Sequence, residues 1–373
     1  MRPRNALILL LIGIVVLVGG WWLGPASQPG ESRHFSAGRL MFPGLAKRLS
    51  QVARIEVTGG GKTLVLMHRP APLHGWGVKE RGLYPIQADR LHAMLTALAE
   101  LRLMSPRTAD PAQYDQLGVG DPNQAQSGAM LLRVLDATGH PLATLIVGHR
   151  RVRGGTDLPD QVFVRRPGAA QSWLAEGDLD VDADPQLWLD RSIMNIGHGD
   201  IAAIQVTRGG STLGFVRKSG HLVLATIDGA APGAAVPKLS PYRLDDLDRG
   251  LEILTFDDVS PDSAPGATAS PGAPIGTARF TTNEGVSISV ALFALPDGAD
   301  PADPSVLARF SASGSGKAAA TAARLNARLA GWTYRLGAWK TRVLVPQLKD
   351  LEPSKPSPAA PSAGATPQSA AHP

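Results

Sequence analysis

Residues 52–67 read VARIEVTGGGKTLVLM, and this segment has the pattern of a β-hairpin. Apolar and polar side chains alternate through residues 52–57, which is typical of a strand with one buried face. Three consecutive glycines at 59–61 form the turn, and a second apolar strand follows at 63–67. The hairpin predicts antiparallel sheet early in the folded part of the chain.

A second copy of this pattern begins about 150 residues later. Residues 201–216 read IAAIQVTRGGSTLGFV, which is again an alternating strand, a glycine turn and another strand. Each hairpin precedes leucines at helical spacing, and each predicted helix precedes a further hairpin. These segments are the helices at 91–101 and 244–254 and the hairpins at 131–147 and 278–292. A repeat of this length indicates duplicated domains and not a solenoid.

The repeat predicts an α+β fold with two related modules. Each module is expected to be an antiparallel sheet with a helix packed on one face. The first module is predicted at residues 39–190 and the second at 191–351, after a linker at 25–38. Residues 260–274 are rich in proline, alanine and serine and predict a flexible insert. The tail at 352–373 has the same composition and is expected to be disordered.

The N-terminal segment predicts a membrane anchor. Residues 6–23 read ALILLLIGIVVLVGGWWL and contain no charged side chain. As a helix they would span about 27 Å, close to the thickness of a bilayer core. We therefore expect a cytoplasmic stub and transmembrane helix at 1–24, with membrane lipid as its partner. A cleaved signal peptide is the alternative, but Pro25 suits a cleavage site poorly and the apolar run is long for a signal core.

The charges around this segment predict the orientation of the chain. Arg2 and Arg4 precede the apolar run, and positive residues favour the cytoplasmic side. The chain is thus expected to be a single-pass protein of the bacterial inner membrane, with a cytoplasmic N-terminus and a periplasmic main body. Nucleic acid is not an expected partner, because the net charge of +5 is mild and the main body would lie outside the cytoplasm.

The composition excludes several kinds of site. The chain has no cysteine, which rules out disulfides, thiolate metal sites, iron–sulfur clusters and cysteine nucleophiles. Hydrophobic residues make up 43% of the chain, so a sizeable core can form. The nine histidines are scattered and show no metal-ligand spacing.

Local motifs for catalysis or metal binding are incomplete. Gly61-Lys62-Thr63 ends like a phosphate-binding loop, but Glu56 stands where that loop needs glycine. Four aspartates alternate at 178–184, yet a calcium loop starting there lacks its glycine and its final glutamate. Asp184 before Pro185 instead fits the cap of a short helix. No catalytic residue, cofactor site or metal site is therefore predicted.

The densest basic cluster is HRRVR at residues 149–153. It is either a solvated loop between strands or a contact for an acidic partner or an anionic lipid surface. Arg150, Arg151 and Arg153 are the candidate contact residues.

Several short passages together resemble one bacterial family. They are LMFPGL at 40–45, YP at 84–85, LRL at 101–103, RTADP at 107–111, LGV at 117–119, QSWL at 171–174, WLDR at 188–191, LN at 325–326 and GWTY at 331–334. In this order they resemble the family called domain of unknown function 4340, over roughly residues 42–351. The insert at 260–274 and the tail depart from the family pattern. The resemblance implies a single-anchor envelope protein associated with ABC-type transporters of the gliding-motility type, and it implies no catalytic residues.

Duplicated modules, a predicted anchor and no catalytic motif favour a non-catalytic accessory or scaffold protein of an ABC-type envelope transport system. Its expected partners are the transporter or its auxiliary subunits. Two alternatives stay open. One is an envelope hydrolase that uses carboxylates such as Asp178 or Asp190, and the other is a module that binds a glycan or a lipid.

Overall fold

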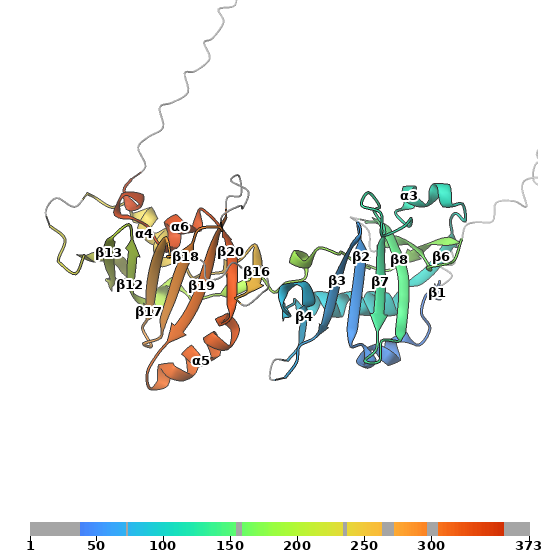
Figure 1. The fold of residues 1–373 in the computed structure, drawn as a ribbon, viewed down its shortest axis with the longest axis horizontal. Coiled ribbons are helices and arrows are strands. Elements are labelled where there is room, and N and C mark those ends of the chain that lie inside the picture. Colours follow the sequence, from blue (N-terminus) through green and yellow to red (C-terminus); the bar gives the residue numbers. More distant parts are fainter. Residues whose placement is uncertain are drawn as a thin grey trace, which may run out of the picture. The chain divides into compact units, whose positions relative to one another are not determined.

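The computed structural model of the chain describes residues 38–71, 74–153, 159–233, 237–262, 272–296 and 305–353. The chain forms two compact units. The first consists of Met1–Thr63 and His92–Ala183, and the second of Leu64–Leu91 and Asp184–Pro373. Antiparallel strands dominate both (Figure 1). The predicted module boundary between residues 190 and 191 stays a prediction.

The first sheet has ten strands in the order β1-β6-β10-β9-β8-β7-β2-β3-β4-β5. Its strands are β1 (Arg39–Leu40), β2 (Arg54–Gly59), β3 (Lys62–His68), β4 (Trp76–Val78), β5 (Tyr84–Pro85), β6 (Arg102–Pro106), β7 (Met130–Leu135), β8 (Pro141–Arg151), β9 (Gln161–Arg165) and β10 (Ser172–Glu176). The helical segments along this stretch of the chain, residues 39–187, are η1 (Leu45–Gln51), η2 (Lys79–Arg81), α2 (Ala88–Glu100), η3 (Pro111–Gln113), α3 (Tyr114–Leu117) and η4 (Pro185–Leu187).

The second sheet has eight strands in the order β14-β13-β12-β17-β18-β19-β20-β16. Its strands are β12 (Ile201–Arg208), β13 (Ser211–Lys218), β14 (His221–Ile227), β16 (Asp258–Pro261), β17 (Gly276–Thr282), β18 (Ser287–Phe293), β19 (Ser305–Ser313) and β20 (Trp332–Gly337). A separate pair joins β11 (Ser192–Met194) to β15 (Leu254–Thr255). The helical segments are η5 (His198–Asp200), α4 (Pro241–Asp248), α5 (Lys317–Leu329), α6 (Lys340–Leu344) and η6 (Leu348–Leu351).

The two sheets follow the same chain path. Read from one end, β6-β10-β9-β8-β7-β2-β3-β4 in the first sheet matches β16-β20-β19-β18-β17-β12-β13-β14 in the second. A detail recurs at the first turn of each copy. The hydroxyls of Thr58 and Thr63 lie 2.8 Å apart, and those of Thr207 and Thr212 lie 3.0 Å apart. Both turns use glycines in the left-handed region, where other residues are strained.

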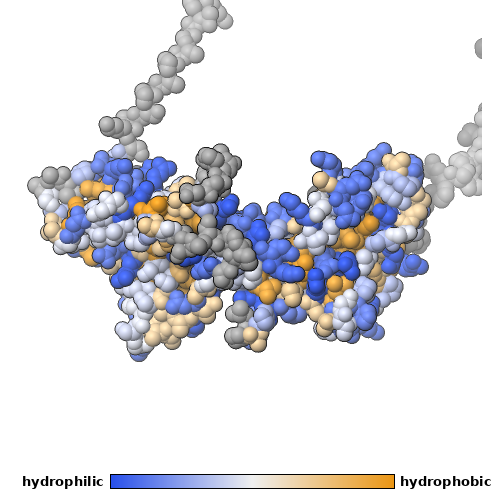
Figure 2. Space-filling view, in the orientation of Figure 1, coloured by the Kyte–Doolittle hydropathy of each residue, from blue (hydrophilic) through white to orange (hydrophobic). Residues whose placement is uncertain are grey.

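The cores form where the periodic patterns predict them. In α2 the stripe Leu91, Met94 and Leu98 is buried, and Leu98 is fully inaccessible. In the second unit, α5 packs beside β19 (Figure 1). The side chain of Asn326 on α5 makes the two backbone hydrogen bonds that a neighbouring strand would otherwise make with β19. Its side-chain amide donates to the carbonyl of Ala312 and accepts from the backbone N–H of the same residue, both at 2.7 Å. Figure 2 shows hydrophilic residues spread over the visible face of each unit, with small hydrophobic patches between them.

The segment Leu64–Leu91 groups with the second unit through specific contacts. The guanidinium of Arg81 binds both carboxylate oxygens of Asp258, at 2.7 and 3.0 Å. The ring of Tyr84 meets Phe256 and Tyr334 edge-on, with centroids 5.3 and 6.1 Å apart. Because aromatic rings bury large apolar areas in defined geometries, this cluster fixes the segment on the unit.

The expected fold class is wrong in its helical part. The structure is mostly antiparallel sheet, and the described residues contain five α-helices, only two of which reach 13 residues. The helix predicted at 244–254 is replaced by the eight-residue α4. It ends at Asp248 because Gly250 follows closely and Ile253 has a positive φ of 43°, so the chain turns before β15.

The predicted membrane anchor is also corrected. Within the described ranges, no helix has the length and apolar character needed to cross a membrane. The span at 6–23, the linker at 25–37 and the tail from residue 354 lie outside the described residues, as do residues 263–271 of the predicted insert. The single-pass inner-membrane location and the periplasmic main body, which rested on that anchor, are accordingly withdrawn.

Candidate functional site

A hollow of about 870 Å³ lies in the first unit, where the neighbouring strands β6, β10, β9 and β8 contribute side chains. Three of its lining residues are arginines, and the lining contains no acidic residue. The lining consists of Met104, Ser105, Arg107, Arg151, Val152, Arg153, Gln161 and Leu174. We call this site the basic hollow.

Arg107 is placed by the junction of β6 and β10. Its backbone N–H donates to the carbonyl of Ser172 at 2.9 Å. The hydroxyl of Ser172 donates to the carbonyl of Thr108 at 2.7 Å and accepts from the N–H of Thr108 at 3.1 Å. Since Ser172 is fully buried, these bonds hold the backbone rigidly. The side chain of Arg107 is left exposed at the hollow.

Arg151, Val152 and Arg153 reach the hollow from the end of β8. The pairing of β8 with β9 shifts in register just before Arg150, and β8 ends one residue later. The backbone N–H of Arg153 then donates to Asp160 at 2.9 Å, which fixes the path of the loop. Val152 is 70% exposed, although large apolar side chains are usually covered.

Arg150 has a different role from the other arginines of its cluster. Its guanidinium contacts the carboxylates of Asp160 at 3.2 Å and Asp180 at 3.5 Å, and it also pairs with Asp178. Its side chain is 32% exposed. These contacts fasten the end of β8 to the acidic stretch, so Arg150 supports the loop and does not line the basic hollow. Of the three predicted contact residues, the structure therefore brings two together at one site.

The basic hollow combines unbalanced positive charge with an apolar floor. Neither Arg107 nor Arg151 forms an ion pair with any residue in the described ranges, and both side chains are exposed. Leu174 is buried beneath the site, and Met104 is half-buried. Guanidinium groups bind carboxylates in a bidentate manner, and the apolar floor suits a hydrophobic side chain.

The sequence analysis did not indicate Arg107, because 44 positions separate it from Arg151. The passage RTADP that contains Arg107 nevertheless carries part of the family resemblance.

The carboxylates considered for hydrolysis belong to different units. Asp178 belongs to the first unit and pairs with Arg150, whereas Asp190 belongs to the second and pairs with Arg328 at 2.8 Å. Their side chains are 73% and 39% exposed. Each carboxylate has an arginine partner within its own unit. These contacts give both residues a structural role in positioning the chain.

Among the described residues, no group of three or more histidines, aspartates and glutamates is arranged to hold a metal ion. The cap predicted at Asp184 is confirmed, because its carboxylate accepts from the N–H of Gln186 at 2.9 Å and Pro185 begins η4.

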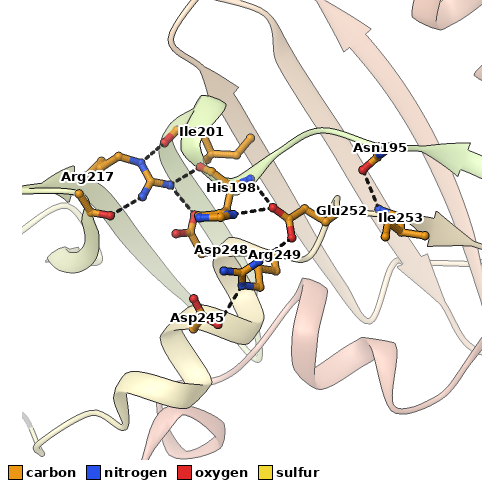
Figure 3. A network of polar contacts seen from close by, with 10 residues as sticks. Asn195, His198, Ile201, Arg217, Asp245, Asp248, Arg249, Glu252 and Ile253 are labelled. Atoms are coloured by element: carbon orange, nitrogen blue, oxygen red, sulfur yellow. Dashed lines mark hydrogen bonds and ion pairs between the residues drawn. The ribbon is translucent and has the colours of Figure 1, made fainter.

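A second polar cluster, in the second unit, was not anticipated from the sequence (Figure 3). At its centre, Oε1 of Glu252 accepts from the backbone N–H of His198 at 2.8 Å and lies 2.5 Å from Nδ1 of the same residue. The other oxygen of Glu252 accepts from Arg249 at 2.9 Å. Hydrogen bonds from His198, and to a smaller extent the bond from Arg249, lower the pKa of Glu252 to about 2.

Arg217 and Asp248 form the buried side of this cluster (Figure 3). Arg217 donates to the carboxylate of Asp248 at 2.5 Å and to the carbonyls of Ile201 at 2.6 Å and Gly220 at 2.9 Å. It also donates to the carbonyl of His198. The side chains of Arg217 and Asp248 are only 15% and 6% exposed. Because these donors and acceptors all face one another, the cluster holds α4 against β12 and β13.

Comparison with known proteins gives one family. No curated protein and no solved structure matches the chain. The family described as "Domain of unknown function (DUF4340)" matches residues 76–273, which is more than half of the chain. The matched range contains every residue of the basic hollow and the polar cluster around Glu252. The chain therefore belongs to the DUF4340 family.

Proposed function

We propose that the chain is a non-catalytic accessory protein of an ABC-type transport system, and that it binds an acidic segment of a transporter subunit in the basic hollow. The observation that carries the proposal is the set of three arginines around an apolar floor, with no acid in the lining. The transport partner is proposed from the family resemblance.

The dimensions and chemistry of the hollow define the partner segment. A volume of about 870 Å³ is large enough for a few side chains of a peptide. Carboxylates on the segment would pair with Arg107 and Arg151, which have no counter-charge among the described residues. A hydrophobic residue beside them would cover Val152 and pack over Leu174. The partner is thus a segment with acidic residues next to an apolar one.

This binding mode predicts a dependence on salt. The exposed arginines would attract an acidic segment over about one Debye length, which is about 8 Å at physiological ionic strength. The apolar contact at Val152 would be insensitive to salt. Raising the salt concentration should therefore weaken the complex without abolishing it.

The test is co-purification of the full chain from its native host, with enrichment of transporter subunits measured by quantitative mass spectrometry. The double variant Arg107→Ala and Arg151→Ala should reduce the enrichment of ATPase or permease subunits at least about tenfold, because two charge-assisted contacts are lost. Lys47→Ala with Lys62→Ala is the matched control, since it removes the same charge from exposed positions of the first unit.

The outcomes separate the proposal from its competitors. Unchanged enrichment in the hollow variant, or an equal loss in the control, would refute binding through the basic hollow. Enrichment of no transporter subunit by the wild-type chain would refute the accessory role.

A further inference from the structure

A second hollow, of about 610 Å³, lies on the polar face of the sheet in the second unit. It extends over the adjacent strands β12, β17, β18 and β19 and reaches the start of β20. The opposite face of the same strands is buried, since Val206, Ala278, Val290 and Phe310 are almost inaccessible. Because side chains alternate across a strand, the residues between these point to the hollow.

One row of polar side chains crosses all four strands. Gln205 on β12 pairs directly with Arg279 on β17, Arg279 pairs with Ser289 on β18, and Ser289 pairs with Ser311 on β19. Neighbouring strands lie about 4.8 Å apart, so the row is about 14 Å long. It presents one guanidinium, one amide and two hydroxyls along a line. Such a row can form several hydrogen bonds with a ligand that is rich in hydroxyl groups.

Arg309 stands in the next row and is held in place. Its Nε donates to the hydroxyl of Thr333 at 2.9 Å and lies 3.1 Å from the carboxylate of Asp262. The hydroxyl of Thr333 in turn donates to Asp262 at 2.5 Å. These bonds fix the guanidinium before any ligand arrives, which lowers the entropy cost of binding.

Arg279 supplies a charge that no described residue of the second unit balances. Its side chain is exposed, and it forms no ion pair with the residues that the structure describes. From the strand register, Arg279 and Arg309 are two strands and two residues apart, which places their Cα atoms on the order of 12 Å from each other. Two long side chains at that spacing can contact the same ligand of disaccharide size.

An aromatic side chain completes the rim. Gly331, with a positive φ of 83°, turns the chain from α5 into β20 and places Trp332 at the hollow. The indole is partly exposed, and Tyr84 holds it edge-on with ring centroids 4.9 Å apart. A fixed indole offers a flat apolar surface to a ring with C–H groups on one face.

We propose that this hollow binds an acidic carbohydrate, namely an oligosaccharide that carries carboxylate groups. The carboxylate would pair with Arg279, and the sugar hydroxyls would bond to Gln205, Ser289 and Ser311. Asp262 accepts further hydroxyl donors, and Trp332 packs on a pyranose face. The volume of the hollow fits a ligand of two sugar units. A neutral sugar would leave Arg279 without its counter-charge.

The experiment uses the full chain and two matched probes, digalacturonic acid and the neutral digalactose, with binding measured by isothermal titration calorimetry. We expect the acidic disaccharide to bind and the neutral one to bind at least about tenfold more weakly, the loss of one charge-assisted contact. Arg279→Ala should weaken binding of the acid by a similar factor and should not affect the neutral sugar. Lys218→Ala, at an exposed position of β13 away from the hollow, is the control.

The proposal fails if neither disaccharide binds, or if the two bind equally. It also fails if Arg279→Ala keeps the wild-type affinity for the acid. Hydrogen exchange of the sheet amides in each variant shows whether the fold is retained. Because the basic hollow is in the first unit, loss of transporter binding there leaves this test unaffected.

Discussion

The buried pair of Arg217 and Asp248 gives the sharpest test of how the second unit is stabilised. Asp248→Ala removes the only carboxylate that Arg217 contacts in the described structure, while the carbonyls of His198, Ile201 and Gly220 remain. A guanidinium that is 15% exposed would then stay in the interior without a counter-charge.

The magnitude follows from that burial. Breaking a buried ion pair by removing one partner typically costs about 3–5 kcal/mol, because the remaining charge is desolvated without compensation. Arg217 keeps its carbonyl acceptors, so we expect the lower part of this range, about 3 kcal/mol. Replacing both residues, as Arg217→Met with Asp248→Leu, removes both buried charges and should cost less than Asp248→Ala alone.

The assay is native-state hydrogen exchange of the β12 and β13 amides, which reports the free energy of opening of this region. The amides of β7 and β8, in the first unit, serve as the internal reference. A decrease of under about 1 kcal/mol in the free energy of opening for Asp248→Ala would refute the reasoning, because exposed ion pairs contribute that little. A double variant as unstable as the sum of the single variants would also refute it.

Three further predictions concern other elements. Leu98→Ala should lower the free energy of unfolding of the first unit by about 2–5 kcal/mol, measured by denaturant titration, because the side chain is fully buried; a loss of under about half a kcal/mol would contradict this. Asn326→Ala should cost about 1–3 kcal/mol in the same assay, because two backbone groups of Ala312 lose their partner, whereas the exposed Arg324→Ala should be nearly neutral. Glu252, whose pKa falls from its ordinary 4.5 to about 2 in the fold, should stabilise the second unit fully above pH 4.5 and progressively less as the pH falls towards 2. The stability difference between the wild type and Glu252→Gln should therefore shrink over that interval, and a difference that stays constant down to pH 2 would contradict the assignment.

Local patterns predicted the strands and the buried stripe well. The hairpins at 201–216, 131–147 and 278–292 are present as β12–β13, β7–β8 and β17–β18. The helix at 244–254 was wrong in length, because apolar spacing continues past Gly250 while the backbone does not. Leu251 and Leu254 are still buried, Leu251 in a turn and Leu254 in β15. The helical spacing of the leucines therefore predicted correctly which side chains are buried, but it predicted the wrong secondary structure for them.

The candidate sites were less predictable than the strands. The run HRRVR identified two residues of the basic hollow, but charge density alone did not separate Arg150, which is tied to three aspartates, from Arg151. Those aspartates lie up to 30 residues away (180 minus 150), beyond any local pattern. The row through Arg279 and Ser289 was missed for a similar reason, since its members come from four strands.

The sequence by itself determined the alternation of apolar side chains, the glycine turns, the absence of cysteine chemistry and the membership of a family. The alternation and the turns depend on neighbours a few positions apart, where the geometry of a strand or turn already constrains which residues fit. The absence of cysteine and the family membership follow from the composition and from passages spread along the chain. Only the tertiary structure decided which arginines are neutralised and which remain available. Arg150 and Arg151 are adjacent in sequence, yet strand pairing gives one a set of carboxylates and the other a place in the basic hollow. The energy of a charge is set by the groups that the fold brings near it and by its access to water, and neither quantity is a property of the residue alone.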